Sequence, residues 1–372
     1  MKAYLDNVTK YSELYNKTNK KYNSISLLRL LSIFLFLFFM FYYIKTDQML
    51  YVMLAVLSFA GFIFLMKIHS RISFQKLLAE TLLKINQNEI SFLKREKTSF
   101  ENGVEFIDFH HPYAYDLDIF GDHSLFQNLN RTASFVGKKT LAALLLHTLP
   151  QTEILENQEA VNELKSKIDW RQEFQALGII SNDSKASYEA IKHWTSFKNN
   201  SLPKVLVALS FILPLTFFGF LAVYFITSKT ILLSYLTYIF IANLLVLGRS
   251  VKRIQSEIAK ADNVDNIIKQ YSLLIEKIEK ESFQSKKLIQ LQEQLNFKNA
   301  KASQHLKQLS ELFSRMDTIN NFVTATLFNG TFLFNLHVLR ALLKWKEDYA
   351  SEMNHWISII GEIEALNSLA NL

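Results

Sequence analysis

The sequence offers few residues whose types and spacing suit catalysis. The nearest approach to a phosphate-binding loop is the run Gly137-Lys138-Lys139-Thr140. Such a loop wraps phosphates with the backbone N–H groups of a glycine-rich turn, which a lysine and a serine or threonine follow directly. Here Thr132 stands where the upstream glycine is needed, and a second lysine separates the Gly-Lys pair from the threonine. We interpret the run as the start of a helix with two solvated lysines, and we expect no ATP hydrolysis by this chain alone.

A second group combines imidazoles and carboxylates between residues 108 and 123. Its members are Asp108, His110, His111, Asp116, Asp118, Asp122 and His123. These side chains are ligands that divalent metals accept, but no fixed helical spacing such as His-Glu-x-x-His supports a site. The alternative is a polar loop whose aspartates cap turns and helices, with Asp122 as the N-cap of the next helix. We favour the loop, and we predict no catalytic, cofactor or metal site.

The remaining candidates for chemistry are isolated in the sequence. The other histidines are scattered and predict no Ser-His-Asp grouping: His147, His193, His305, His337 and His355 among them. The chain has no cysteine, which excludes disulfides and thiolate nucleophiles. Among 372 residues there are 31 Phe but only 9 Gly and 4 Pro, a balance that is typical of long helices. The expected fold class is therefore mainly α.

Four blocks hold many of the apolar residues. They cover residues 25–44, 49–66, 205–226 and 231–247, and Arg29 is the only charged residue within them. Each is about as long as the roughly 20 residues that a bilayer-spanning helix needs. A helix of a soluble core would show a polar stripe, and these blocks do not. We predict four transmembrane helices; the alternative is a pair of buried hairpins in a large soluble core.

The flanking residues predict how these spans lie in the membrane. Links of about four residues force two hairpins, and Lys and Arg concentrate outside them, before 25, after 66, before 205 and after 247. By the positive-inside rule, both termini and the middle segment are cytoplasmic in a multi-pass protein of the inner or plasma membrane. No Asp, Glu or Lys lies at mid-depth, so the spans are expected to be anchors rather than a transport path. Asn243 is expected to hydrogen-bond to a neighbouring helix.

The pattern divides the chain into six segments. These are a cytoplasmic N-terminal tail (1–24), the first transmembrane hairpin (25–66), an amphipathic helix with an irregular connector (67–121), a helical segment (122–202), the second hairpin (203–247) and long helices (248–372). Breaks are expected near Pro150 and Gly178. Apolar stripes at three- and four-residue steps predict long helices over 254–278, 288–316 and 331–372, the last bent near Gly361.

The most specific stretch is Asp116 to Leu164, which reads DLDIFGDHSLFQNLNRTASFVGKKTLAALLLHTLPQTEILENQEAVNEL. Ser124-Leu125 start a helix, Asn130-Arg131-Thr132 close it, and Gly137 opens the next. This resembles the start of the core domain of the MutS mismatch-repair ATPase family, where the run SLL..LNRT.T..G...L...L precedes I..RQ.AV..L. The positions that match as scaffold are Asp116, Asp118, Phe120, Gly121, Ser124, Leu125, Asn130, Arg131, Thr132 and Gly137. Asn157 replaces the usual arginine of the second run.

The resemblance implies a helical core with long lever helices that lead to an ATPase domain. Residues 362–370 resemble the helix just before that domain, so ATP and Mg²⁺ are expected only with an ATPase module in a longer chain or a separate chain. Family members typically form dimers. The Phe-x-Glu element that reads mismatches in the family is absent, and a membrane hairpin occupies the N-terminal region. The implied function is that of a membrane-anchored MutS-like protein related to DNA mismatch-repair ATPases.

Two expectations about partners stay open at this point. The net charge of +7 partly reflects the positive-inside distribution. DNA contact would be unspecific, phosphate-dominated and salt-sensitive, with candidates among Lys277, Lys280, Lys286 and Lys287. The alternative for these lysines is a solvated helix face of mixed sign, and the alternative function is a non-enzymatic membrane scaffold that presents coiled helices to a protein partner.

Overall fold

The computed structural model describes residues 1–196, 201–260, 264–297 and 300–371. Within these residues the chain is mainly α-helical, which confirms the predicted fold class, with one antiparallel strand pair, β1 (Asn296–Phe297) and β2 (Ala300–Lys301). Four helices are long and apolar enough to cross a membrane: α1 (Lys2–Thr46), α2 (Met49–Leu93), α8 (Lys204–Thr227) and α9 (Ile231–Lys260). The chain forms two compact units, residues 1–101 with 168–180 and residues 102–167 with 181–372.

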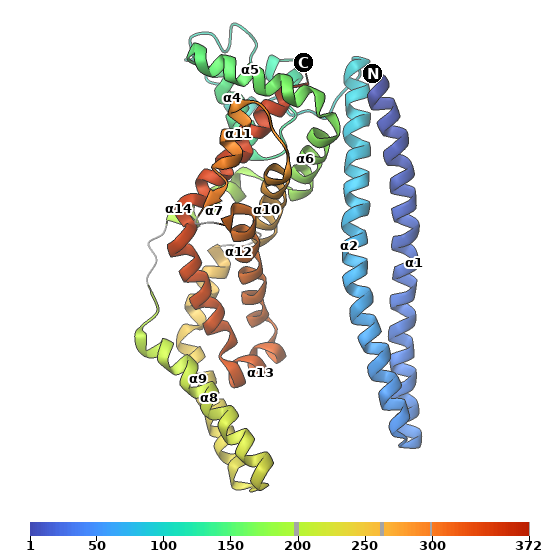
Figure 1. Cartoon of the computed structure of the whole chain (residues 1–372), viewed down its shortest axis with the longest axis vertical. Helices are drawn as coiled ribbons and strands as arrows, with labels where there is room; N and C mark the ends of the chain where they lie inside the picture. Colours follow the sequence, from blue (N-terminus) through green and yellow to red (C-terminus); the bar gives the residue numbers. More distant parts are fainter. Residues whose placement is uncertain (197–200, 261–263, 298–299, 372) are drawn as a thin grey trace. The chain divides into compact units, whose positions relative to one another are not determined.

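The first unit contains α1, α2 and α6 (Ile168–Ser181), and α1 and α2 run side by side (Figure 1). The sequence pattern predicted the N-terminal tail (1–24) and the amphipathic helix after residue 66 as segments separate from the apolar spans. In the structure this is wrong, because the tail is the first part of α1 and the amphipathic helix is the last part of α2. Neither Gly nor Pro interrupts residues 1–46 or 62–93, so nothing stops either helix at the end of its apolar block. The turn between the two helices is short, as predicted, and Asp47 adopts the left-handed conformation there at φ 52°.

Helix α6 packs on the polar ends of this helix pair. A buried cluster joins Tyr11, Leu82, Ile85 and Ala176. Beside it, the side-chain amide of Gln172 exchanges two hydrogen bonds of 2.9 Å with that of Asn86. The sequence grouped α6 with residues 122–202, whereas in the structure it belongs with the first hairpin. The reason is the buried amide pair, whose two halves lie 86 residues apart and carry no local signal.

We expect Gln172→Leu to lower the free energy of unfolding of the first unit by about 2 kcal/mol. The substitution leaves the buried carbonyl oxygen of Asn86 without its donor, which costs the desolvation of that group. The control is Lys10→Ala, which removes an exposed ion pair to Asp169 and should cost less than about 1 kcal/mol. Urea unfolding in detergent checks both values, and an equal loss in the two variants would contradict the role of the amide pair.

The second unit begins with short helices. They are η1 (Val104–Phe106), α3 (Leu125–Leu129), α4 (Phe135–Leu146), α5 (Gln151–Ser166) and α7 (Lys185–Ser196). The predicted break at Pro150 is confirmed, because α5 begins directly after that residue. The predicted break at Gly178 is wrong, since this glycine is buried inside α6. The chain turns instead at Asn182, which has a positive φ of 50°.

The second unit continues through the second hairpin into the C-terminal helices. These are α10 (Val264–Lys280), α11 (Lys286–Glu293), α12 (Ala302–Met316), η2 (Asp317–Asn320), α13 (Phe322–Phe332) and α14 (Phe334–Leu369). The apolar stripe expected over 288–316 is buried, as at Leu288 and Leu306, but it does not lie on one helix. The strand pair interrupts it, and Phe297 packs its ring against Tyr349 and Trp356. The stripe over 254–278 is buried at Ile254, Ile268 and Ile275, although residues 261–263 lie outside the described part.

Helix α14 is the longest helix of the second unit and crosses it from α13 to α4 (Figure 1). The bend expected at Gly361 is absent, since α14 is continuous through this residue. A Cβ at position 361 would lie 2.8 Å from the Thr140 hydroxyl oxygen and 3.1 Å from the Val136 carbonyl oxygen. The glycine therefore permits the close approach of α14 to α4.

Candidate functional site

The loop before α3 holds the first four family-motif positions. Asp116 and Asp118 are exposed. Gly121 has a φ of 111° and donates its N–H to the Asn102 carbonyl oxygen at 2.9 Å. The ring of Phe120 packs on that of Phe126, with centroids 5.4 Å apart. The acidic residues thus face solvent, and the apolar ones hold the loop to α3.

Ser124 is the residue that caps α3. Its hydroxyl oxygen accepts a hydrogen bond from the Gln127 N–H at 3.2 Å, and Leu125 begins the helix with an exposed side chain. The expectation that Asp122 is the cap is therefore wrong. The Asp122 carboxylate instead accepts from the Asn102 side-chain amide at 2.7 Å. In the described residues no three His, Asp or Glu side chains gather in a way that could hold a metal ion.

Asn130, Arg131 and Thr132 close α3 as the sequence predicted. The Asn130 side-chain oxygen accepts from the Thr132 N–H at 3.0 Å and from its hydroxyl at 2.7 Å. Arg131 donates from its guanidinium to the carbonyl oxygens of Asn128 and Asn130, at 3.0 and 3.1 Å. The backbone N–H of Arg131 also reaches the hydroxyl oxygen of Ser368, 3.1 Å away on α14. The motif is thereby tied to the C-terminal part of the chain.

A buried carboxyl group lies at the start of α4. The Glu364 side chain accepts from the N–H groups of Ala133 and Ser134, each at 3.1 Å, and from the Ser134 hydroxyl in a short hydrogen bond. Ser134 is the N-cap of α4, and its hydroxyl oxygen accepts from the Gly137 N–H at 3.0 Å. The N-terminus of a helix favours a negative or hydrogen-bond-accepting group through its unpaired N–H groups. Glu364 supplies that group from α14.

Burial is the main influence on the pKa of the Glu364 carboxyl group. Desolvation raises the pKa of Glu364 to about 7, although its three hydrogen bonds act in the opposite direction. Asp183 lies nearby and accepts from the Phe135 N–H and the Tyr271 hydroxyl, both at 2.9 Å. Burial also raises the pKa of Asp183 and holds that of the Tyr271 hydroxyl well above its usual value. The Glu364 and Asp183 carboxyl groups both accept hydrogen bonds from N–H groups at the start of α4, so we interpret the arrangement as structural.

The second run of the resemblance lies on α5 and joins the same packing. Ala160 and Leu164 are completely buried. Val161 faces a groove of about 490 Å³ that Leu144 of α4 and Leu369 of α14 also line. The segments 124–137, 154–164 and 362–370, whose sequences we compared with those of the MutS family, therefore meet in space. We call this contact of α3, α4 and α5 with the end of α14 the motif junction.

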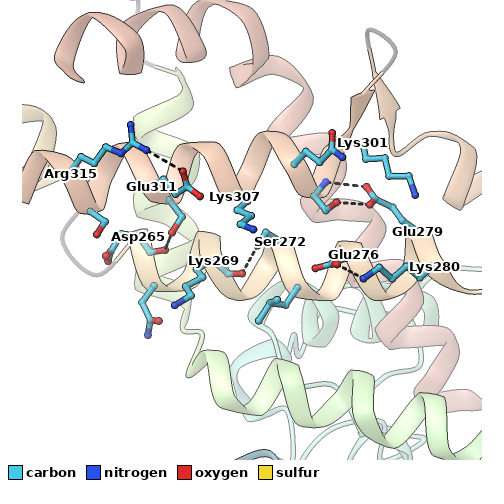
Figure 2. Close-up of a pocket in the computed structure, with 16 residues that line it drawn as sticks. Asp265, Lys269, Ser272, Glu276, Glu279, Lys280, Lys301, Lys307, Glu311 and Arg315 are labelled. Atoms are coloured by element: carbon cyan, nitrogen blue, oxygen red, sulfur yellow. Dashed lines mark hydrogen bonds and ion pairs between the residues drawn. The ribbon is translucent and has the colours of Figure 1, made fainter. Parts of the chain in front are cut away.

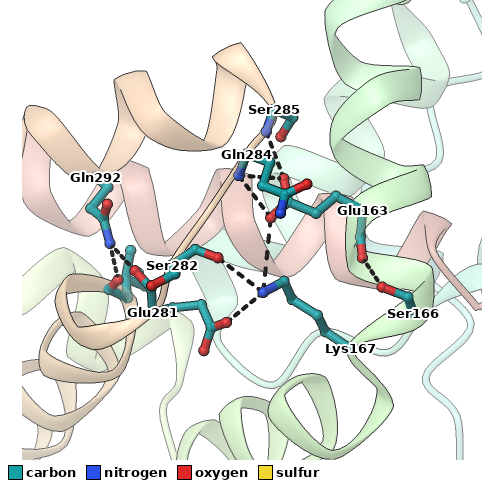
Figure 3. Close-up of polar contacts among 9 residues, drawn as sticks. Glu163, Ser166, Lys167, Glu281, Ser282, Gln284, Ser285 and Gln292 are labelled. Atoms are coloured by element: carbon teal, nitrogen blue, oxygen red, sulfur yellow. Dashed lines mark hydrogen bonds and ion pairs between the residues drawn. The ribbon is translucent and has the colours of Figure 1, made fainter.

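Polar contacts extend from α5 to the turn between α10 and α11 (Figure 3). The Glu163 carboxylate accepts from the N–H groups of Gln284 and Ser285, the latter at 2.7 Å, just before α11 begins. Lys167 reaches the Glu281 carboxylate at 2.5 Å and the Ser282 carbonyl oxygen at 3.0 Å. The end of α5 thus fixes the α10–α11 turn against the motif junction.

The lysines that the sequence offered for phosphate contact already have partners. Lys280 pairs with Glu276, Lys286 with Glu156 at 2.7 Å, and Lys287 with Glu362 at 2.9 Å. Lys277 also takes part in an interaction within the chain. The predicted set therefore does not form an open phosphate-binding face. The sequence places acids beside Lys280, but the partners of Lys286 and Lys287 are more than 70 residues away.

A groove of about 840 Å³ between α10 and α12 offers a different set of cations (Figure 2). Lys269, Lys301 and Lys307 line it, and neither Lys269 nor Lys307 forms an ion pair with any described residue. Across the same groove Arg315 pairs with Glu311 at 3.5 Å. The Glu279 carboxylate accepts from the Ser303 N–H at 3.0 Å. Sequence reasoning missed this groove because it exists only once α12 pairs with α10.

The sequence also missed Glu364, Ser134 and Asp183, and only the first left a signal. Glu364 follows Trp356 and Ile360 at four-residue steps, so helical periodicity places this acid on the buried stripe of α14.

No known protein family matches the chain, and neither a curated protein nor a solved structure matches it.

Proposed function

We propose that this chain is a membrane-anchored MutS-like protein, the core and lever of a machine related to DNA mismatch-repair ATPases. The motif junction is the observation that supports it. Three segments that resemble the family one by one pack together, and Arg131, Ser134 and Gly137 all lie against the same turn of α14 around Glu364.

Helix α14 is the lever in this proposal. Its 36 residues span about 54 Å at the usual rise per residue. One end lies at the second hairpin, where the His337 ring donates to the Ser210 carbonyl oxygen at 2.9 Å. The other end lies in the motif junction. A rigid helix between these points transmits movement from one to the other, and an ATPase module outside these 372 residues would supply the drive.

Weak, unspecific DNA contact forms part of the proposal, and the α10–α12 groove is its best site. Lys269, Lys301 and Lys307 present ammonium groups to one groove, and phosphate neutralisation needs charge rather than base-edge contacts. The Lys/Arg distribution supports cytoplasmic termini and a cytoplasmic middle segment, which would place this groove in the cytoplasm.

The test is fluorescence anisotropy of a labelled DNA duplex with the full chain in nanodiscs, titrated against salt. We expect the double variant Lys269→Gln/Lys307→Gln to weaken binding and to reduce the slope of log affinity against log salt by about 2, one unit per lost phosphate contact. The control is Lys286→Gln, whose ammonium already pairs with Glu156 and should leave the slope unchanged. Matched and mismatched duplexes should bind alike.

The paired lysines favour a second candidate function, a non-enzymatic scaffold that presents the helices to a protein partner. Lys280, Lys286 and Lys287 stabilise contacts within the chain and are not free for a ligand. A complete lack of salt-dependent DNA binding would favour the scaffold over the first proposal. A Walker-type loop encoded directly after this sequence would favour the first.

A further inference from the structure

The chain makes a sharp elbow where α13 meets α14. The two helices are bent by 83° at Leu333, which adopts the left-handed conformation at φ 50° (Figure 1). No Asp, Glu, Lys or Arg occurs from Thr318 to Leu339. The sequence pattern predicted a long helix over 331–372 and gave no role to the uncharged run before it.

The C-terminal end of α13 is fixed to the second hairpin. The Asn243 side-chain amide on α9 donates to the Gly330 carbonyl oxygen at 2.8 Å. Gly330 also permits contact with the Phe240 ring, because a Cβ at position 330 would lie 2.1 Å from a carbon of that ring. The ring of Phe332 packs on Phe218 of α8, with centroids 4.8 Å apart.

These contacts lie inside the apolar blocks of the hairpin. Asn243 and Phe240 lie about 6 and 10 Å before the end of block 231–247, at 1.5 Å per residue. Phe218 lies about 20 Å along block 205–226 from its start. If α8 and α9 cross a bilayer, their contacts hold the tip of the elbow within its hydrocarbon.

Nearer its start, α13 exposes large apolar side chains. Phe322 is 82% exposed and Phe328 is 46% exposed, and Val323 and Leu327 are exposed between them. Large exposed apolar faces on a protein mark a contact with lipid or with a partner. Continuity with two candidate spans, and the lack of any charge on the segment, favour lipid.

Several polar side chains of the elbow are hydrogen-bonded within it, which lowers the cost of placing them in hydrocarbon. The Asn335 N–H donates to the Asn329 side-chain oxygen at 2.8 Å, and the Asn335 amide group donates to the Met316 carbonyl oxygen at 3.2 Å. The Asn321 side chain caps the start of α13. The hydroxyl of Thr331 donates back to the Leu327 carbonyl oxygen at 2.7 Å.

We infer that α13 and Leu333 form a re-entrant membrane elbow, whose exposed side chains Phe322, Val323, Leu327 and Phe328 contact lipid acyl chains. The elbow enters the bilayer beside the second hairpin, turns at Leu333 and leaves as α14. The lever helix is thereby seated in the membrane and not only beside it. This inference depends on α8 and α9 as spans and not on any DNA contact.

The chain has no cysteine, so single cysteines allow spin labelling at chosen positions. We would label Phe328→Cys and Leu327→Cys in the full chain, reconstituted in phosphatidylcholine–phosphatidylglycerol vesicles, and measure power saturation by oxygen and by a water-soluble nickel chelate. Leu245→Cys is the matched lipid control, since Leu245 is exposed on α9 two residues from Asn243. Gln308→Cys, exposed on α12, is the water control.

We expect both α13 labels to resemble the Leu245 label, with oxygen accessibility several-fold above that of the nickel chelate. High nickel accessibility, as at Gln308, would place α13 in water and overturn the inference. Low accessibility to both reagents would mean that a second copy or another protein covers the face, which overturns it equally. A Leu245 label in water would show instead that α9 is no span.

Discussion

Gly137→Ala is expected to lower the free energy of unfolding of the second unit by about 3 kcal/mol. A Cβ at this position would lie 1.9 Å from one carboxyl oxygen of Glu364 and 2.9 Å from its Cβ. The Glu364 side chain cannot swing away freely, because Ala133 and Ser134 hold it through their N–H groups. Over-packing of a close contact typically costs 1–3 kcal/mol, and this contact falls at the upper end.

The matched control is Gly248→Ala on α9. No atom lies within 4 Å of a Cβ there, so alanine should leave the stability unchanged or raise it by up to about 1 kcal/mol through helix propensity. Denaturant unfolding followed by tryptophan fluorescence measures both variants in the same detergent. Equal stability of Gly137→Ala and the unmodified chain would show that α4 and α14 are not in the close contact described.

Glu364→Ala should have the second large effect, a loss of about 3 kcal/mol. The substitution leaves the N–H groups of Ala133 and Ser134 buried without an acceptor, and it opens a cavity at the start of α4. Glu364→Gln keeps a carbonyl acceptor of nearly the same shape, so it should retain most of the stability. Similar losses for Ala and Gln would mean that the negative charge itself, and not hydrogen bonding, stabilises the junction.

The same residue makes the stability depend on pH. Its folded pKa of about 7 lies above the value of 4.5 for an unperturbed glutamate. Between these values the folded chain retains a proton that the unfolded chain releases, so stability falls as pH rises from about 4.5 to 7 and then levels off. The total fall is on the order of 3 kcal/mol. The raised pKa of Asp183 acts in the same direction.

Glutamine does not titrate, so Glu364→Gln removes the proton that the folded chain retains and the unfolded chain releases. Its unfolding free energy should therefore vary much less between pH 4.5 and 7, and the variant should be at least as stable as the unmodified chain above pH 7. Asp183→Asn alone should leave most of the pH dependence in place. A profile of the unmodified chain that rises with pH over this window would refute the assignment of a raised pKa to Glu364.

The sequence predicted what depends on local composition and periodicity. The apolar blocks, the short turns and the mainly α fold follow from hydropathy and from the scarcity of Gly and Pro. The helix start at Ser124 and the closing role of Arg131 follow from capping patterns, and both are confirmed. Sides of the membrane and DNA contact stay predictions, because neither is a property of the folded chain alone.

What the sequence could not predict depends on distant partners. The strand pair around Phe297 forms because α14 presents Tyr349 and Trp356 to this ring. The sequence left Lys286 and Lys287 open between phosphate contact and a solvated helix face, whereas both form ion pairs with acids on α5 and α14. Gly178 and Gly361 looked like helix breakers, but both stay inside helices.

Because α1 is one continuous helix, the number of residues between two points on it sets the angle between the faces on which they lie. Tyr11, which packs near α6, and Ile25, where the apolar block begins, are separated by 14 positions, or about four turns and 21 Å. One residue added between them would turn the α6-binding face by about 100° around the axis relative to the apolar block. Seven residues would restore its direction to within about 20°. Insertions or deletions of one or two residues between Tyr11 and Ile25 should therefore be tolerated least, because they rotate the α6-binding face furthest from its direction relative to the apolar block.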